Sequence, residues 1–156
     1  MRRLASIVLS VGLLAFNGAA SAAGSGTAPN TPNTPDAAVS QADTQGARAA
    51  IQAQLKAFAA DDAKRAFSFA TPQLRRFFGT PENFIATVRN GYPVVYRPAS
   101  VAFLKPERDG DALVQAVHMT DADGVLWLAL YHLERQPDKS WRISGCQVVE
   151  AKGQVT

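Results

Sequence analysis

The hydrophobic periodicity of this chain changes at Asn90-Gly91, and this change constrains the fold more than any other feature. Before it, apolar residues recur at helical spacing, as at Ile51, Leu55 and Phe58. After it, the period becomes two, as expected for β-strands. Helices in the first half and strands in the second predict an α+β fold, with helices packed on one face of a curved antiparallel sheet.

Capping signals divide the helical half into four predicted helices, over residues 45–60, 63–70, 72–78 and 81–89. Asp61-Asp62 ends the first helix and caps the second. Thr71-Pro72 and Thr80-Pro81 each place a capping hydroxyl before a proline at the first helical position, where the missing N–H costs nothing. Asn90-Gly91 is expected to end the last helix in a left-handed conformation.

The second half predicts four antiparallel strands joined as a meander. The extended segments cover residues 92–104, 112–120, 125–136 and 141–149. Asp109-Gly110, Asp121-Ala-Asp-Gly124 and Pro137-Asp-Lys-Ser140 are the turns between them. Pro93 and Pro98 interrupt the first segment, so it is expected to begin irregularly or at a sheet edge.

The N-terminus has the pattern of a secretory signal. Met-Arg-Arg precedes the apolar run Leu4 to Phe16, and Ala20 and Ala22 form an A-x-A site. We predict a signal peptide over residues 1–22, cleaved near Ala22; the alternatives are an N-terminal membrane anchor or a buried helix, and the run is short for a membrane span. The mature protein is expected to be exported, periplasmic or secreted, with no permanent membrane anchor.

A low-complexity stretch follows the predicted signal. It is rich in Gly, Ser, Thr, Asn and Pro and includes the repeat Pro29-Asn-Thr-Pro-Asn-Thr-Pro35. Such a composition buries too little apolar area to offset the entropy of ordering, so residues 23–43 are predicted to form a disordered linker. Residues 44–156 remain as a single α+β domain, large enough for one hydrophobic core.

Charge argues against a nucleic-acid partner. The formal net charge of +3 falls to +1 when Arg2 and Arg3 leave with the signal, so the chain lacks the basic footprint of a nucleic-acid-binding protein. Basic residues concentrate between Lys64 and Arg108, whereas acids prevail from Asp109 onward. The basic region fits a solvated helix face, or an anionic ligand or membrane surface.

Several short motifs point to a family. Trp127-Leu-Ala-Leu-Tyr131 and Trp141-Arg-Ile143, preceded by helices, resemble the nuclear transport factor 2-like cone fold. More narrowly, the order and spacing of several segments resemble an uncharacterised bacterial family, domain of unknown function 4864, over roughly residues 46–153; these segments are Phe67-Ser-Phe-Ala70, Phe78-Gly79, Tyr92-Pro-Val94, Arg97-Pro98, Tyr131-His-Leu-Glu-Arg-Gln136 and Trp141-Arg-Ile-Ser-Gly-Cys146. The resemblance implies a cone-like fold and carries no established activity.

Metal and hydrolase sites are not expected. The histidines and cysteines that could bind a metal are His118, His132 and Cys146, and their spacing is not that of a zinc site. Neither a metal nor a cofactor is therefore predicted. If Asp123-Gly124 forms a two-residue turn, His118 faces Ala129 and the two histidines are not opposed. No Gly-x-Ser-x-Gly elbow and no glycine-rich phosphate loop occur in the sequence.

Five residues are candidates for binding a ligand or partner: Tyr92, Tyr96, Arg97, Tyr131 and His132. Tyr96 and Arg97 are expected on a rigid extended segment, either at the mouth of the cone or in structural roles, the tyrosine packing on helices and the arginine pairing with an acid. Strand alternation places Tyr131 and His132 on opposite faces, so they are not expected to act together.

The sequence therefore favours an exported, non-enzymatic domain that binds a small apolar ligand or an envelope protein. One alternative is a cofactor-free enzyme, isomerase- or dehydratase-like, moving a proton in the cone. Another is a periplasmic lipid carrier that uses the basic region. A cavity filled by apolar side chains would argue against the enzyme, whereas an open pocket with a buried ionisable group would favour it.

The last strand contains the chain's single cysteine. Strict alternation would place Cys146 beside Arg142 and Ser144. A bulge at Gly145 would instead place it with the apolar residues Trp141 and Ile143. The second arrangement groups the apolar residues better, so Cys146 is predicted to be a small buried hydrophobe rather than a reactive thiol.

Overall fold

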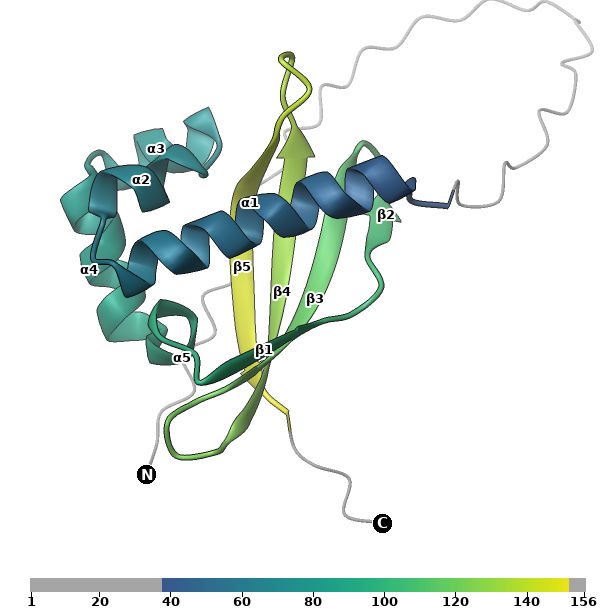
Figure 1. Ribbon diagram of the computed structural model, residues 1–156. Helices are drawn as coiled ribbons and strands as arrows, with labels where there is room; N and C mark the ends of the chain where they lie inside the picture. The colour runs from purple at the N-terminus through teal and green to yellow at the C-terminus, as the bar shows by residue number, and fades with distance from the viewer. Residues whose placement is uncertain (1–37, 152–156) are drawn as a thin grey trace, which may run out of the picture.

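The computed structural model describes residues 38–151, in which five helices precede a five-stranded sheet (Figure 1). The helices are α1 (Gln41–Ala59), α2 (Ala63–Ser68), α3 (Pro72–Phe78), α4 (Pro81–Gly91) and α5 (Pro93–Tyr96). The strands are β1 (Ser100–Phe103), β2 (Glu107–Asp109), β3 (Ala112–Thr120), β4 (Leu126–Arg135) and β5 (Trp141–Glu150). The predicted α+β class is confirmed. The predicted signal peptide, and the predicted linker up to residue 37, lie outside the described residues.

The sheet is open and antiparallel, in the order β1-β3-β4-β5, and β2 also pairs with β3. Four strands were expected, and the fifth, β2, comes from residues predicted to be a loop. Residues 104–106 separate two short strands that pair with opposite ends of β3, at Val117 to Thr120 and at Ala112 to Val114. One long partner strand is thus replaced by two short ones.

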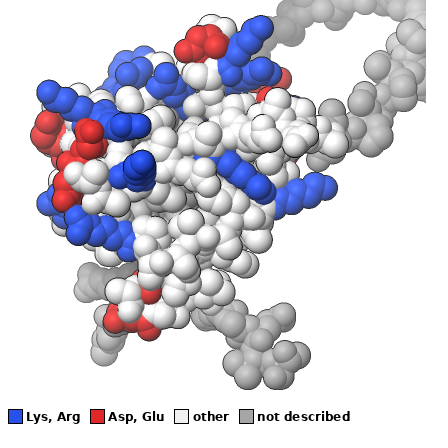
Figure 2. Space-filling view, in the orientation of Figure 1, with Lys and Arg blue, Asp and Glu red and all other residues white. Residues whose placement is uncertain are grey.

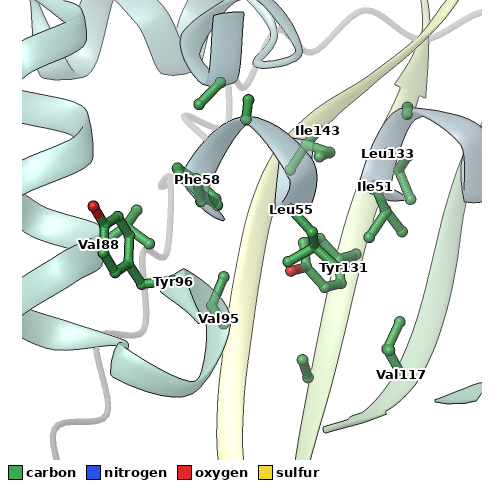
Figure 3. Packing of buried hydrophobic residues seen from close by; sticks show 14 of the residues in the cluster. Ile51, Leu55, Phe58, Val88, Val95, Tyr96, Val117, Tyr131, Leu133 and Ile143 are labelled. Atoms are coloured by element: carbon green, nitrogen blue, oxygen red, sulfur yellow. The ribbon is translucent and has the colours of Figure 1, made fainter. Parts of the chain in front are cut away.

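The core lies between α1 and one face of the sheet. Along β3, residues alternate between buried and half-buried, so Leu113, Gln115, Val117 and Met119 face inward. Figure 3 shows Ile51 and Leu55 of α1 beside side chains of β4 and β5, with Val95 and Tyr96 of α5 closing the side. Figure 1 shows α2, α3 and α4 beyond the β5 edge rather than over the sheet.

The predicted helix caps are confirmed. Side chains of Asp62, Thr71 and Thr80 each accept a hydrogen bond from a backbone N–H in the first turn of α2, α3 and α4 respectively. Ser40 caps α1 in the same way, so α1 begins at Gln41 and includes residues 41–43 of the predicted linker.

The predicted conformation of residues 90–97 is wrong. Gly91 is the last residue of α4, and its backbone φ is not positive. Pro93 then opens α5 instead of an extended segment, because proline at a first helical position loses no hydrogen bond. Tyr96 therefore ends a short helix, and Arg97 follows it as the cap residue.

Two turns decide which side chains share a face. At the β3–β4 hairpin, Thr120 pairs with Leu126, so the loop spans residues 121–125 and is longer than the predicted two-residue turn. Gly124 in this loop has a left-handed backbone, with φ 80°. His118 consequently faces Leu128 rather than Ala129, although the histidines remain unopposed. The predicted bulge in β5 is confirmed, because the register shifts between His132 and Leu133.

No helix in the range 38–151 is long and apolar enough to cross a membrane.

Candidate functional site

A cavity with a volume of about 940 Å³ lies between α3 and α4 on one side and β4 and β5 on the other. A short connection positions these helices. Thr71 N–H donates to the Ile143 carbonyl at 2.9 Å, and Ile143 N–H donates to the Phe69 carbonyl at 2.8 Å. The chain between α2 and α3 is thereby fixed to the free edge of β5, which places α3 and α4 beside the sheet.

The helical wall of the cavity is aromatic. Phe77, Phe78 and Phe84 line it, together with Leu74 and Val88. Phe78 lies edge-on to both Phe77 and Phe84, with ring centroids 5.1 Å apart in each pair. Phe77 is nevertheless 63% exposed, an unusual exposure for a phenylalanine beside a cavity. This wall offers a ligand an apolar surface that water now contacts.

The sheet wall contains two neutral ionisable groups, Tyr131 and Cys146. They are cross-strand partners that both face the helices, Tyr131 by alternation along β4 and Cys146 because of the predicted β5 bulge. Cys146 is half-buried rather than fully buried as predicted. The Tyr131 hydroxyl is buried and finds no hydrogen-bond partner among the described residues. Burial raises the pKa of Tyr131 well above its ordinary value and raises the pKa of Cys146 to about 12. Both groups therefore stay protonated at neutral pH.

His132 also lines the cavity, but from the other side of the sheet. It pairs with Val114 and Gly145, whereas Tyr131 pairs with Gln115 and Cys146. The predicted separation of Tyr131 and His132 onto opposite faces is confirmed. Asp109 and Glu134 line the cavity from the same side as His132, so its rim there carries two carboxylates.

The remaining three candidates divide between the cavity and a separate cluster. Tyr92, the C-cap residue of α4, lines the cavity. Tyr96 and Arg97 do not; they meet Asp61 at the junction of α1 and α2. Arg97 Nη2 lies 2.8 Å from Asp61 Oδ2, and the Tyr96 hydroxyl donates to Asp61 Oδ1.

Arg89 completes this cluster. Its guanidinium lies 3.5 Å from Asp61 and donates to the Tyr96 hydroxyl at 3.1 Å. The guanidinium groups of Arg89 and Arg97 also lie over the Tyr96 ring, 5.1 and 5.3 Å from its centroid. These contacts join α4 and α5 to the end of α1, so Tyr96 and Arg97 have structural roles.

Sequence reasoning missed the aromatic wall. Phe77 and Phe78 were assigned only to a short helix, although two consecutive phenylalanines on one helix cannot both face a single core. That pattern was the signal available for an exposed apolar surface. No group of three or more His, Cys, Asp or Glu residues that could hold a metal ion occurs within residues 38–151.

Comparison with known proteins places the chain in a family without assigning an activity. No curated protein matches it. A solved structure with which it shares similarity is an NTF-2 like protein of unknown function from Burkholderia xenovorans LB400, with 19% identity, a TM-score of 0.39, and coverage of 70% of this chain and 90% of that one. The family model for Domain of unknown function (DUF4864) matches residues 40–156. Because that match covers most of the chain, this protein belongs to the DUF4864 family.

Proposed function

We propose that this protein is exported and acts without catalysis, binding a small apolar ligand in the cavity between α3, α4 and β5. The observation that carries the proposal is a cavity of about 940 Å³ with an aromatic wall, one member of which, Phe77, is 63% exposed. Cavities of this size and lining suit small organic molecules. Covering the phenylalanine face would remove apolar area from water, which favours association.

The ligand is expected to be uncharged. None of the described residues that line the cavity is Lys or Arg, and its inner wall holds the protonated groups of Tyr131 and Cys146. An anionic head group would lose hydration there without gaining a cationic partner. This disfavours the alternative of an anionic-lipid carrier that uses the basic region.

A cofactor-free enzyme is the second alternative. The cavity is open and contains buried ionisable groups, a combination that by itself favours an enzyme. However, Tyr131 and Cys146 have raised pKa values and cannot serve as a base near neutral pH. His132 lies on the opposite face from Tyr131, so an imidazole base and a phenol donor do not converge on one substrate atom. Binding therefore fits the residues better than proton transfer.

Binding is tested with the neutral fluorescent probe N-phenyl-1-naphthylamine. Thr87 lines the cavity from an exposed position on α4, so Thr87→Trp should narrow the cavity and weaken probe binding about tenfold or more, the order expected from losing a few apolar contacts. Ala86→Trp is the matched control, because Ala86 is the exposed neighbour on the same helix outside the lining.

The native ligand is sought by mass spectrometry of protein isolated from its own envelope fraction. A bound neutral small molecule, released less readily from the control than from Thr87→Trp, is the expected result. If the isolated protein carries no small molecule and neither variant changes probe binding, the cavity is not a ligand site and an envelope protein becomes the better candidate partner.

A further inference from the structure

A second, independent hollow lies at the end of the sheet where β2 meets β3 and β4 meets β5. It has a volume of about 730 Å³ and is lined by Arg108, Arg135 and Lys139, with Asp111, Gln136 and Trp141. Figure 2 shows basic side chains beside the β4–β5 hairpin at the top of the view. The sequence separates Arg108 from the other two bases by more than twenty residues, so the fold alone brings them together.

Strand alternation concentrates positive charge on this side of the sheet. Arg108 and Arg135 point to the α1 face, where both lie within ion-pair distance of Asp43, at 3.0 and 3.6 Å. Their sequence neighbours Asp109 and Glu134 pair through Ala112 on the opposite face. The two faces at this end of the sheet therefore carry opposite charges.

The positive charge in the hollow is incompletely neutralised. Asp43 is shared between two guanidinium groups, and the lining adds one ammonium, Lys139, and one exposed carboxylate, Asp111. Asp138 accepts hydrogen bonds from Ser140, within its own turn. Arg108 Nε is buried and finds no hydrogen-bond partner among the described residues. A buried donor beside net positive charge is the local chemistry that an anion satisfies.

We propose that this basic hollow binds the carboxylate or phosphate group of a small anionic molecule. Arg108 and Arg135 present planar guanidinium groups suited to two-point contact with such a group, and Lys139 adds a flexible cation at the rim. Trp141, only 7% exposed, also lines the hollow. This site is distinct from the apolar cavity, because Arg108, Arg135 and Lys139 line only the basic hollow.

The sequence contains two tryptophans, so one can be made the sole reporter. Trp127 lies near the far hairpin, where its indole donates to Asp121, and Trp127→Phe leaves Trp141 as the fluorophore. Inorganic phosphate and citrate are titrated into the full chain carrying this change, at constant ionic strength. A saturable change in Trp141 emission is expected. A change that does not saturate, or that sodium chloride reproduces equally, would overturn the proposal.

Charge variants assign the signal to the hollow. Arg135→Gln with Lys139→Asn should weaken anion binding tenfold or more; asparagine is used because Lys139 has φ 67°, a conformation that asparagine tolerates. Lys64→Gln with Arg65→Gln removes the same charge from the exposed face of α2 and should leave affinity unchanged. Equal weakening by both pairs would mean that the anion responds only to overall charge, which contradicts a site.

A third titration, with lipid vesicles, shows whether the bound carboxylate or phosphate belongs to a small soluble anion or to a lipid head group. Binding to phosphate or citrate in solution identifies a small soluble anion. Binding only to phosphatidylglycerol vesicles, and not to phosphatidylcholine vesicles, identifies a lipid head group; either result supports the site if the Arg135 and Lys139 changes abolish it. Thermal unfolding of each variant confirms that the fold is retained, and unchanged affinity in a folded double variant would refute the proposal.

Discussion

Gly46 illustrates how one hydrogen atom in place of a methyl group permits the packing of α1 on β5. A Cβ at this position would lie 2.7 Å from Cδ1 and 3.3 Å from Nε1 of Trp141, which is buried. Alanine favours a helix over glycine by about 1 kcal/mol. Overpacking in a core costs roughly 1–3 kcal/mol, so the contact outweighs the propensity.

Gly46→Ala is therefore expected to lower the free energy of unfolding, by up to about 2 kcal/mol after the gain in helix propensity. Gly91→Ala is the matched control. Gly91 also lies in a helix, has open space around its would-be Cβ and has no positive φ, so this change should be neutral or stabilising. Urea denaturation measures both. A stabilised Gly46→Ala variant would show that α1 does not pack against Trp141 as described.

The reactivity of the Cys146 thiol tests whether β5 contains the bulge. Burial raises its pKa from 9.0 to about 12, so the native thiolate population falls on the order of a thousandfold relative to the unfolded chain. Labelling with Ellman's reagent at mildly alkaline pH should accordingly be very slow in the native protein and fast in urea. Native and unfolded rates within tenfold of each other would place the sulfur in solvent and reject the bulged register.

Asp61 connects three helices through a backbone conformation that few residues adopt. It has φ 56° and lies at the end of α1, where it meets Tyr96 and Arg97. Its side chain is 52% exposed, so each ion pair contributes at most about 1 kcal/mol. The left-handed backbone costs alanine about 1 kcal/mol and glycine almost nothing.

Three substitutions separate these effects. Asp61→Gly should destabilise the protein only through lost side-chain contacts, whereas Asp61→Ala adds the backbone cost and should be about 1 kcal/mol worse. Asp61→Asn keeps a hydrogen-bonding side chain and should destabilise least. Chemical denaturation ranks the three; an alanine variant as stable as the glycine variant would mean that α1 and α2 reconnect without the left-handed residue.

Elements governed by local chemistry were predictable, and those governed by distant packing were not. The caps at Asp62, Thr71 and Thr80 depend on contacts three residues away, so the sequence pattern alone was sufficient. Helix α5 was missed because Pro93 is compatible with either an extended or a helical start. Packing of Val94, Val95 and Tyr96 into the core stabilises the helical one.

The same distinction applies to the cavity. Alternation along β4 correctly predicted that Tyr131 and His132 lie on opposite faces, and the structure shows that Tyr131 is the one that faces the core. The cavity itself arises where residues 69–71 join the edge of β5, a contact between segments some seventy residues apart. Pairing at that range depends on the assembled fold rather than on a local pattern, so Phe77 and Phe78 could not be assigned to a cavity wall in advance.

At the scale of the whole molecule, Asp43 joins the start of α1 to the sheet. Its pKa is lowered, first by the hydrogen bond with Ser40 and then by the guanidinium groups of Arg135 and Arg108. A lowered native pKa stabilises the fold above the unfolded value of 3.8 and loses that contribution as pH falls through the native value. Asp43→Asn should therefore lower the melting temperature near neutral pH and make little further difference in acid. Thermal unfolding at about pH 6 and about pH 3 measures this effect. An equal decrease in melting temperature at both pH values would mean that the charge of Asp43 is not what stabilises the fold.

The alkaline limit of stability should depend on the pair Tyr131 and Cys146. Both pKa values are raised in the native state by burial, so the neutral forms stabilise the fold fully below the unfolded values of 10.0 and 9.0. As pH rises beyond 9, the unfolded chain releases these protons first, and each group reduces stability by up to ~1.4 kcal/mol per pH unit until its native pKa is reached. For Cys146 that window runs from 9.0 to about 12.

Tyr131→Phe with Cys146→Ala removes both protons, so the double variant should lose stability less steeply above pH 9 than the wild-type chain. Tyr92 and Tyr96 remain in both proteins and provide the common background. Urea denaturation at a series of alkaline pH values gives the two slopes. Parallel slopes would mean that the cavity wall is hydrated and ionises freely, which would also undermine the proposal that the cavity prefers an uncharged ligand.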